Sequence, residues 1–308
     1  MNALTLKHLR YFAALARQRH FGRAADEVSI SQPAMSVQIR ELEALIGAPL
    51  VERGARQIRL TDLGARFAEA AEAILRDVDA LGDMVRGARE GFAGPLRIGV
   101  IPTIAPYILP RLITDLAARY PDLDPRPRET VTQSLIAELV DGRLDCALMA
   151  LPVSEPALHE VEIVEEEFVL VRHARDADRA VPNPETLRQM RLLLLEEGHC
   201  FRDQALSYCA KGGRGPRDMM EGSSLSTLVQ MVGAGIGVTL VPQMAVATET
   251  RAAPVSVAHL SDPRPTRTIG MVWRKTNPLG ARLAEIVPLV REATAAAIAA
   301  GEARMVET

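Results

Sequence analysis

The chain contains little cysteine: only three of its 308 residues, Cys146, Cys200 and Cys209. So few thiols exclude a small secreted scaffold held together by disulfides. In a compartment that keeps thiols reduced, a cysteine pair is more often catalytic, redox-sensing or metal-binding than a structural staple. The sequence therefore raises the question of what Cys200 and Cys209, nine positions apart, do.

The chain also lacks any apolar run long enough to cross a bilayer. Its first residues, MNALTLKHLRYF, lack the small-residue cleavage site of a secretory signal. We therefore expect a cytoplasmic protein with no membrane contact. Hydrophobic residues make up 48% of the chain and charged residues 24%, which is typical of a globular protein. A chain of this length predicts two or three domains.

The net charge of −3 is small but unevenly distributed. Residues 1–60 contain nine Lys or Arg and five Asp or Glu, a balance of +4, which leaves −7 for the rest of the chain. A basic N-terminal region on an acidic body favours a polyanion such as DNA as the partner of that region.

Three amphipathic segments follow one another in the N-terminal region. The third, ISQPAMSVQIRELEALIG, has a Ser31 that can cap a helix, a proline that the first turn tolerates, and a Gly47 that can end it. Its apolar residues recur at helical spacing and predict one buried stripe. That stripe comprises Met35, Ile39, Leu42 and Ile46.

The opposite face of this third segment is polar and predicts a DNA-reading surface. Two helices joined by a short turn form a helix-turn-helix, whose second helix reads the major groove. The following stretch, ERGARQIRLT, predicts a wing whose Arg53 and Arg56 contact phosphates. The alternative is a three-helix bundle with a solvated basic face. The predicted groove-facing residues are Gln32, Pro33, Ser36 and Arg40.

A longer string makes the prediction specific. Ala24-Ala25, Ser31-Gln32-Pro33-Ala34, Ser36, Gln38-Ile39 and Leu42-Glu43, followed by GAPLVER and LTDLG, resemble the LysR-type transcriptional regulators. The resemblance implies binding to promoter DNA, contact with RNA polymerase and assembly into a homodimer or homotetramer. It also implies a winged helix-turn-helix at 1–60 and a dimerising linker helix at 61–91.

The linker shows a heptad pattern of its own. Phe67, Ile74 and Leu81 lie seven apart, and Ala71, Val78 and Val85 lie four positions after them. Such an a/d seam favours a helix from about 62 to 88 that pairs with a second copy. The alternative is a helix that packs on its own chain. EGFAGP at 90–95 then breaks the pattern and predicts a domain boundary.

Beyond this boundary, short apolar runs alternate with helical stretches. Examples are LRIGVIP, LLLLEE, GVTLVP and TIGMVWR, which predict strands of parallel sheets covered by helices. The family resemblance implies an α/β multidomain protein whose effector domain has two lobes and resembles the periplasmic binding proteins. It implies a regulatory lobe I at 92–165 and 268–308, a lobe II at 166–267, and crossings near 164–167 and 266–269.

The segment EEGHCFRDQALSYCA holds both questioned thiols. Cys200 follows a predicted strand and begins a predicted helix, where the helix N-terminus and the neighbouring His199, Arg202 and Asp203 can stabilise a thiolate. Peroxide would convert that thiolate to a sulfenic acid, with Cys209 as the candidate partner thiol. If the segment is helical, the two thiols meet only after local unfolding, for which AKGGRGP at 210–216 is a candidate hinge.

Several motifs resemble the peroxide-sensing OxyR group of the family. They are GHCFRDQ followed by a second cysteine, IPTIAPYILP, LDC, SLSTLVQMV and TIGMVWR. The resemblance implies that Cys200 reacts with peroxide, that Cys209 resolves the product, and that no cofactor or metal takes part. ETVTQS offers Thr130 as a competing register for one pocket residue. The implied peroxide pocket comprises Thr103, Thr132, His199, Asp203 and Arg274.

Other interpretations remain. Cys146, in an apolar run, is expected to be a buried structural thiol. Zinc binding by His199, Cys200 and Cys209 fits no standard ligand spacing. A peroxidase would use similar cysteine chemistry but would not need a DNA-binding region, so we expect no enzyme. A regulator that senses a small metabolite between its lobes, with incidental cysteines, is the main alternative.

Overall fold

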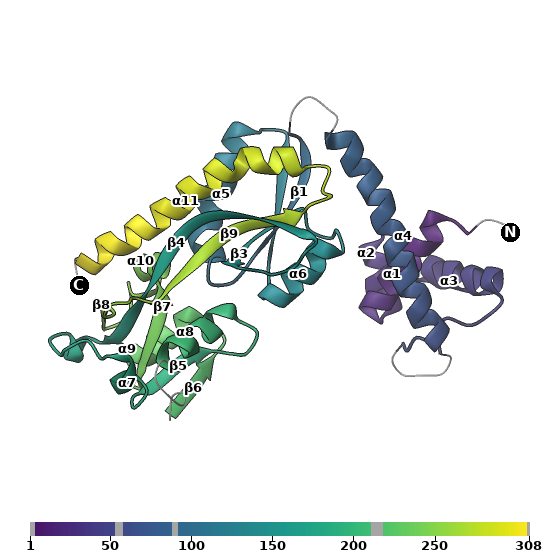
Figure 1. The fold of residues 1–308 in the computed structure, drawn as a ribbon. Helices are drawn as coiled ribbons and strands as arrows, with labels where there is room; N and C mark the ends of the chain where they lie inside the picture. The colour runs from purple at the N-terminus through teal and green to yellow at the C-terminus, as the bar shows by residue number, and fades with distance from the viewer. Residues whose placement is uncertain (1–3, 53–57, 88–91, 211–217, 307–308) are drawn as a thin grey trace. The chain divides into compact units, whose positions relative to one another are not determined.

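A computed structural model of the protein describes residues 4–52, 58–87, 92–210 and 218–306. The chain divides into two compact units, residues 1–85 and 86–308, and each is described by itself (Figure 1). Arg53 and Arg56 of the predicted wing lie outside the described residues, as does most of the predicted hinge at 210–216.

The first unit is built on three short helices, α1 (Leu6–Gln18), α2 (Phe21–Glu27) and α3 (Gln32–Ile46). The Ser31 hydroxyl accepts a hydrogen bond from the Ala34 amide and caps α3, and Gly47 ends it with a φ of 78°. Because glycine adopts this left-handed conformation without a steric penalty, the helix stops there. Met35, Ile39 and Leu42 are buried against Phe12 of α1, so the predicted helix-turn-helix is confirmed.

A β-bridge between Val51 and Leu60 closes the wing, and α4 (Asp62–Gly87) follows it. The Thr61 hydroxyl accepts a hydrogen bond from the Gly64 amide at 2.9 Å and caps α4. Gly64 must remain glycine, since a Cβ there would lie 2.0 Å from the Leu50 carbonyl oxygen.

The apolar residues of the heptad pattern in the linker helix α4 differ in burial between the two halves of the helix. In the first half Phe67 meets Phe12 edge-to-face, with ring centroids 5.5 Å apart, and Ala71 is buried. This half of the heptad pattern therefore packs on its own head. Ile74 and Leu81 are 45% and 62% exposed, so the second half presents an uncovered apolar surface.

The second unit contains one mixed sheet. Within the described residues its strands run in the order β2-β1-β3-β9-β4-β7-β5-β6, with β8 also on β4. β1 pairs in parallel with β2 and β3, and β5 with β6 and β7, as the strand–helix alternation predicts. The strands are β1 (Gly94–Val100), β2 (Leu123–Glu129), β3 (Cys146–Leu151), β4 (Leu158–His173), β5 (Arg191–Leu195), β6 (Asp218–Gly222), β7 (Val238–Pro242), β8 (Val255–His259) and β9 (Thr266–Arg274).

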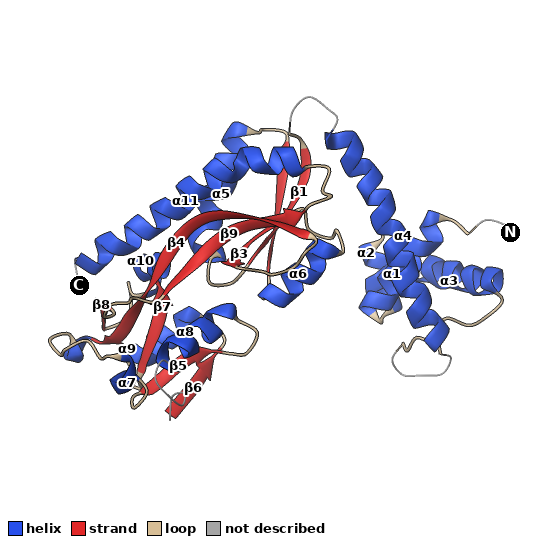
Figure 2. Ribbon diagram, in the orientation of Figure 1, coloured by secondary structure: helices blue, strands red, loops and turns tan. Residues whose placement is uncertain are grey.

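Helices cover both ends of this sheet (Figure 2). They are α5 (Ala105–Arg119), α6 (Thr132–Val140), α7 (Pro184–Leu187), α8 (Cys200–Ala210), α9 (Leu225–Gly233), α10 (Val246–Glu249) and α11 (Gly280–Val306), with short 3-10 turns η1 (Ala174–Asp176) and η2 (Gln243–Ala245).

Two hydrophobic cores divide the second unit into lobes. The first lobe is built around β1 and β3 and contains Ile98, Cys146 and Leu148. The second is built around β5 and β7 and contains Leu193, Cys209 and Leu240. Long strand β4 pairs with β9 along its first part and with β7 and β8 along its last, so β4 runs from one core into the other. The two-lobed α/β fold is thus confirmed.

The last helix, α11, lies along both lobes (Figure 1). Its Leu283 and Val290 belong to the first core, and Met305 packs against the second. A Cβ at Gly301 would lie 2.0 Å from the Gln243 carbonyl oxygen, so α11 touches η2 closely. Among the described helices, none combines the length and apolarity needed to span a membrane.

Candidate functional site

The two cysteines of the questioned segment lie in one helix, α8, and both thiols are free. An α-helix rises about 1.5 Å and turns about 100° per residue, so nine residues place them about 13 Å apart and on opposite faces. A disulfide requires Cα atoms within about 7 Å. The two sulfurs therefore cannot bond while α8 is intact.

The two thiols have different surroundings. Cys200 is half-buried and packs against the core of the first lobe, whereas Cys209 is buried in the core of the second. Burial raises the pKa of the Cys209 thiol to about 11, although the Arg188 guanidinium acts in the opposite direction. At neutral pH Cys209 is therefore a protonated and weakly nucleophilic thiol.

Cys146 differs from both. It begins β3 and is completely buried in the core of the first lobe. Burial, together with the neighbouring Asp145 carboxylate, raises the pKa of its thiol well above the ordinary value. The prediction of a buried thiol at this position is confirmed.

A tight turn connects β5 to α8 and presents His199. Gly198 has a φ of 96°, a conformation that favours glycine, and lets the chain reverse within the four residues between Leu195 and Cys200. Burial lowers the pKa of His199, against the opposite effect of the Glu196 and Glu129 carboxylates. The imidazole beside Cys200 is therefore biased toward its neutral form.

The two charged residues after Cys200 point to different environments. The Arg202 side chain is nearly buried, and its Nη1 donates to the Leu195 carbonyl at 2.9 Å and to Glu221 of β6 at 2.5 Å. Asp203 is exposed on the first turn of α8. Arg202 therefore ties the start of α8 to the strands beside it, while Asp203 faces solvent.

A cavity of about 320 Å³ opens between the two lobes, beside the start of α8. Thr103 and His199, both predicted pocket residues, line it from opposite lobes. Asp203 and Arg274 are not among the lining residues. The lining comprises Pro102, Thr103, Pro106, Tyr107, Glu129, Thr130 and Val131 from the first lobe, and Leu195, His199, Ser223, Ser224, Leu225, Ser226 and Glu249 from the second.

Thr130 and Thr132, the two alternatives for one predicted pocket residue, occupy different positions. Thr130 lines the cavity, whereas Thr132 is the first residue of α6. The Thr132 hydroxyl is buried without a hydrogen-bond partner. Since buried hydroxyls usually find a partner, this one is available to a small polar molecule.

Arg274, also a predicted pocket residue, lies apart from this cavity. Its side chain lies against Gly142, where a Cβ would be 2.6 Å from Nη1. Burial lowers the pKa of Arg274. The positive charge of Arg97 acts in the same direction, and the Asp145 carboxylate acts in the opposite one. These residues do not line the cavity, so the structure does not bring Arg274 to the predicted pocket.

An arginine that contacts a cavity-lining residue is Arg267, on the same strand β9. Its Nη1 donates to the Thr103 hydroxyl at 2.8 Å, its Nη2 donates to the Thr103 carbonyl, and its guanidinium lies 5.8 Å from the Phe201 ring centroid. Its ion pair with Glu166 of β4 spans 2.8 Å, and both side chains are fully buried. Sequence reasoning missed Arg267 because a single arginine at a strand start carries no distinctive pattern.

Glu166 extends this contact to η2, the turn after β7. Its Oε1 accepts a hydrogen bond from the Met244 amide at 2.8 Å, where η2 follows β7. Through Arg267, the same carboxylate is linked to Thr103 in the first lobe. The buried pair therefore joins Thr103 of the first lobe to η2, where Met244 packs in the first core and Ala245 in the second.

A second polar contact crosses the cavity. The Tyr107 hydroxyl of α5 donates to Glu249 of α10 at 2.8 Å, and the Ser226 hydroxyl donates to the other carboxylate oxygen at 2.5 Å. Burial and the Glu249 carboxylate raise the pKa of Tyr107, so its hydroxyl remains a neutral donor. Glu249 thus connects α5 of the first lobe with α9 of the second.

The other predicted site lies on the head. On α3, Gln32, Pro33 and Arg40 are exposed and Ser36 is partly exposed, on the face opposite the buried stripe. The Arg40 Nε donates to the Ser36 carbonyl at 3.1 Å. This surface is free of the head's own core and has the polar groups that base edges and phosphates require.

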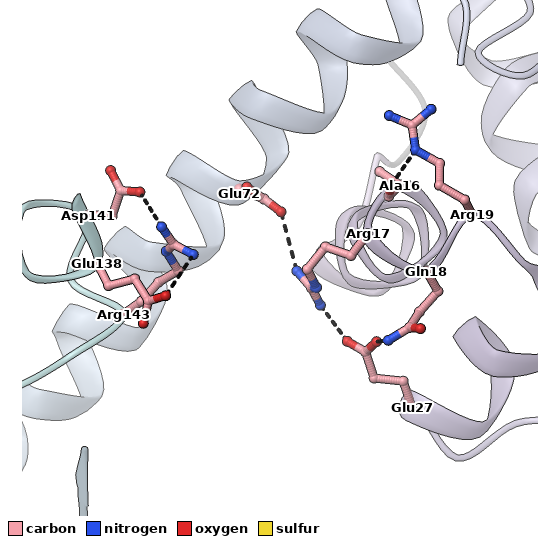
Figure 3. A network of polar contacts seen from close by, with 9 residues as sticks. All are labelled: Ala16, Arg17, Gln18, Arg19, Glu27, Glu72, Glu138, Asp141 and Arg143. Atoms are coloured by element: carbon pink, nitrogen blue, oxygen red, sulfur yellow. Dashed lines mark hydrogen bonds and ion pairs between the residues drawn. The ribbon is translucent and has the colours of Figure 1, made fainter. Parts of the chain in front are cut away.

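Figure 3 shows polar contacts within each unit. In the head, Arg17 of α1 pairs with Glu27 of α2 at 2.5 Å and with Glu72 of α4 at 3.3 Å. In the second unit, Arg143 pairs with Asp141 at 3.0 Å. The Arg17 contacts fix α4 to the helix-turn-helix. In the described part of the chain, no group of three or more His, Cys, Asp or Glu side chains could hold a metal ion.

Comparisons with known proteins agree on one family. The model of the bacterial regulatory helix-turn-helix proteins of the lysR family matches residues 6–65, and that of the LysR substrate binding domain matches residues 89–295. The chain is 40% identical over 294 residues to a probable hydrogen peroxide-inducible genes activator of Streptomyces viridosporus, covering 94% of each chain.

Two further comparisons concern proteins named OxyR. The chain is 38% identical over 290 residues to the DNA-binding transcriptional dual regulator OxyR of Escherichia coli K12, covering 94% of this chain and 95% of that protein. A cysteine-to-serine mutant of Corynebacterium glutamicum OxyR, bound to hydrogen peroxide, superposes with a TM-score of 0.67 at 34% identity. That alignment covers 98% of this chain and 96% of the other.

The buried pair at the crossing gives a stability prediction. Arg267→Met leaves the fully buried Glu166 carboxylate without its ion partner. We expect a loss of about 3–5 kcal/mol in the free energy of unfolding, because an unpaired buried charge is strongly destabilising. Urea unfolding followed by the fluorescence of Trp273, the single tryptophan of the chain, measures the loss.

Arg264→Met is the matched control. Arg264 pairs with Glu167, the next residue of β4, at 3.0 Å, but both side chains are about one-third exposed. This variant should unfold near the wild-type urea concentration, since exposed pairs contribute little. Equal losses in the two variants would contradict the special role assigned to the buried pair.

Proposed function

The chain belongs to the LysR family of bacterial transcriptional regulators, in the OxyR group, and on that basis we propose that it senses hydrogen peroxide through a reversible Cys200–Cys209 disulfide and controls oxidative-stress genes. One observation carries the proposal most strongly. Two thiols with opposite surroundings occupy one helix that must open before they can bond.

The chemistry of the proposed switch balances in two steps. The Cys200 thiolate attacks one oxygen of peroxide, the O–O bond breaks, and Cys200 becomes a sulfenic acid while hydroxide leaves and takes a proton from solvent to form water. The Cys209 thiol then attacks the Cys200 sulfur, the S–O bond breaks, and a second water leaves as the disulfide forms. A cellular dithiol returns the pair to its reduced form by thiol–disulfide exchange.

The proposed peroxide site lies at the start of α8. His199 and Thr103 line the cavity there, and the unpartnered Thr132 hydroxyl lies on the neighbouring α6. Arg267 orients the Thr103 hydroxyl by donating to it, which leaves that hydroxyl's own proton for peroxide. We assign these groups to binding and polarising the O–O bond and assign no such role to Asp203 or Arg274.

The proposed output is a change of fold. Bringing Cys200 to Cys209 must disrupt α8, whose Phe201 packs on Phe168 with centroids 4.8 Å apart. Phe168 follows Glu166 on β4, beside the buried pair that joins the lobes. Remodelling of α8 therefore acts directly on the crossing of the two lobes.

The head supplies the proposed DNA contacts, through the α3 face and the wing arginines Arg53 and Arg56. The uncovered Ile74 and Leu81 of α4 favour pairing with a second copy, since an exposed apolar stripe is stabilised by burial. A homodimer or homotetramer could then read two half-sites of promoter DNA and contact RNA polymerase. Such a regulator acts in the cytoplasm.

A second candidate is a regulator that responds to a small metabolite. The inter-lobe cavity of about 320 Å³ favours it, because that volume exceeds what a peroxide molecule needs. Footprinting on the chain's own promoter distinguishes the two functions. A peroxide sensor changes its footprint with peroxide and reductant, whereas a metabolite sensor ignores both.

The surroundings of the thiols predict the order of oxidation. Cys200 should react with peroxide first, because Cys209 is buried and protonated at neutral pH. In Cys209→Ser, peroxide should trap a sulfenic acid on Cys200 that dimedone labels, and mass mapping should find no disulfide. Cys200→Ser should keep the reduced footprint at low peroxide.

Cys146→Ser serves as the control for these variants. Its thiol lies in the other core, so the response to peroxide should equal that of the wild type apart from a modest loss of stability. Dimedone labelling of Cys209 in the Cys200→Ser variant at the wild-type rate would overturn the assigned order.

The exposed face of α3 predicts two kinds of DNA-binding variant. Arg40→Ala should weaken binding to all sequences and lower the salt dependence by about one unit if Arg40 contacts one phosphate. Gln32→Ala and Ser36→Ala should instead change sequence preference by about 1–3 kcal/mol, as expected for lost base contacts. Fluorescence anisotropy at several salt concentrations separates these effects.

Arg179→Ala is the control for DNA binding. Its side chain is 77% exposed on the second unit, far along the chain from the head. This variant should bind specific and random DNA like the wild type. Wild-type binding by all three α3 variants would remove this face from the DNA interface.

A further inference from the structure

In the structure, the Arg202 guanidinium is bound to Glu221 and to a backbone carbonyl of the second lobe. Arg202 lies two residues after Cys200, and its side chain is only 11% exposed. Its Nη1 donates both to the Leu195 carbonyl, at the end of β5, and to the Glu221 carboxylate on β6. One guanidinium therefore fastens the first turn of α8 to two strands of the second lobe.

Formation of the disulfide must disturb the contacts of Arg202 with Leu195 and Glu221. The thiols lie about 13 Å apart along the helix, and a disulfide needs Cα atoms within about 7 Å. Cys209 and its neighbour Tyr208 are buried in the second core, whereas Cys200 is only half-buried and follows the Gly198 turn. The Cys200 end is thus the freer one to move, and Arg202 moves with it.

We propose that Glu221 is a positioning residue that holds Arg202, and through it the start of α8, in the reduced conformation, and so sets how readily the Cys200–Cys209 disulfide closes. This inference rests on the proposed function. Glu221 does not line the cavity and lies outside α8, so it acts on the closing step and not on the reaction of Cys200 with peroxide.

The partial exposure of the pair suits a tuning role. The Glu221 side chain is 46% exposed, so water and salt weaken its attraction for Arg202. Phe201, fully buried against Phe168, contributes the apolar part of the same turn's attachment. Changing the charge at position 221 therefore shifts the balance between the reduced and disulfide forms without removing the core contact.

Glu221→Gln tests the inference in the full-length protein. Glutamine keeps the shape and an acceptor oxygen but loses the charge, which makes the hydrogen bond to Arg202 weaker. In buffers of reduced and oxidised dithiothreitol, the equilibrium constant for disulfide formation should rise about fivefold, equivalent to about 20 mV for a two-electron couple. Alkylation and mass mapping of the 200–209 segment measure it.

Kinetic measurements distinguish an effect of Glu221 on disulfide closure from an effect on the reaction of Cys200 with peroxide. With dimedone in the Cys209→Ser background, Glu221→Gln should leave the rate of sulfenic acid formation unchanged. With both cysteines present, the conversion of sulfenic acid to disulfide should accelerate about fivefold. High salt should reduce the difference, because it screens the half-exposed pair in the wild type.

Asp218→Asn is the matched control. Asp218 lies on the same strand β6 and pairs with Arg191 of β5 at 2.8 Å, but neither residue belongs to α8. This variant should close its disulfide like the wild type. An equal shift in Asp218→Asn, or a change below about twofold in Glu221→Gln, overturns the positioning role.

The outcomes also distinguish this inference from the function on which it rests. If wild-type protein forms no 200–209 disulfide with peroxide, the proposed function fails. If the wild type switches and Glu221→Gln switches identically, only the role of Glu221 fails. Glu221→Ala, at the same exposed position, provides a second variant with the same expected direction.

Discussion

A continuous helix between two thiols is the constraint on which the account depends. While α8 is intact, its geometry keeps Cys200 and Cys209 on opposite faces, with one thiol at the lobe interface and the other inside a core. Bond formation and helix integrity therefore exclude each other. Formation of one disulfide therefore requires rearrangement of the whole helix α8. Such coupling of a local chemical change to a larger structural change is the basis of a conformational switch.

The position of α8 determines what the rearrangement can affect. Its Phe201 contacts both Phe168 of β4 and the guanidinium of Arg267 on β9. Arg267 and Glu166 are completely buried at the crossing, with hydrogen bonds to Thr103 of the first lobe and to the Met244 amide of η2, which follows β7. Removing Phe201 from this place changes the packing of both crossing strands. Helix α11 also packs on both cores, so a movement of one lobe against the other would have to change its contacts.

Much of the fold could be predicted because its signals are local. The buried stripe of α3, its Ser31 cap and its Gly47 stop follow from spacing and residue type. Strands with apolar runs, such as β5 and β7, were also predictable. Strand β2 was not predictable, because it contains Pro125 and Pro127 and is mostly exposed. In the described sheet it is an edge strand next to β1, a position that tolerates prolines.

The site was predictable only in part. Cys200, His199 and Thr103 belong to recognisable motifs, and the last two line one cavity. Arg274 was predicted there, whereas Arg267, which donates to Thr103, was not predicted. Both belong to β9, at opposite ends, and only the three-dimensional crossing of β4 and β9 decides which end contacts Thr103 beside the cavity. Likewise, the pairing of Arg202 with Glu221 joins residues 19 positions apart across two strands, a distance at which no sequence pattern operates.

The most direct test of the central claim is amide hydrogen exchange over residues 200–210, measured by mass spectrometry before and after peroxide. In the wild type, oxidation should abolish the protection of the α8 amides as the disulfide forms. In Cys209→Ser, peroxide should oxidise Cys200 while the α8 amides stay protected. A 200–209 disulfide in a chain whose α8 amides remain as protected as in the reduced protein would contradict the account.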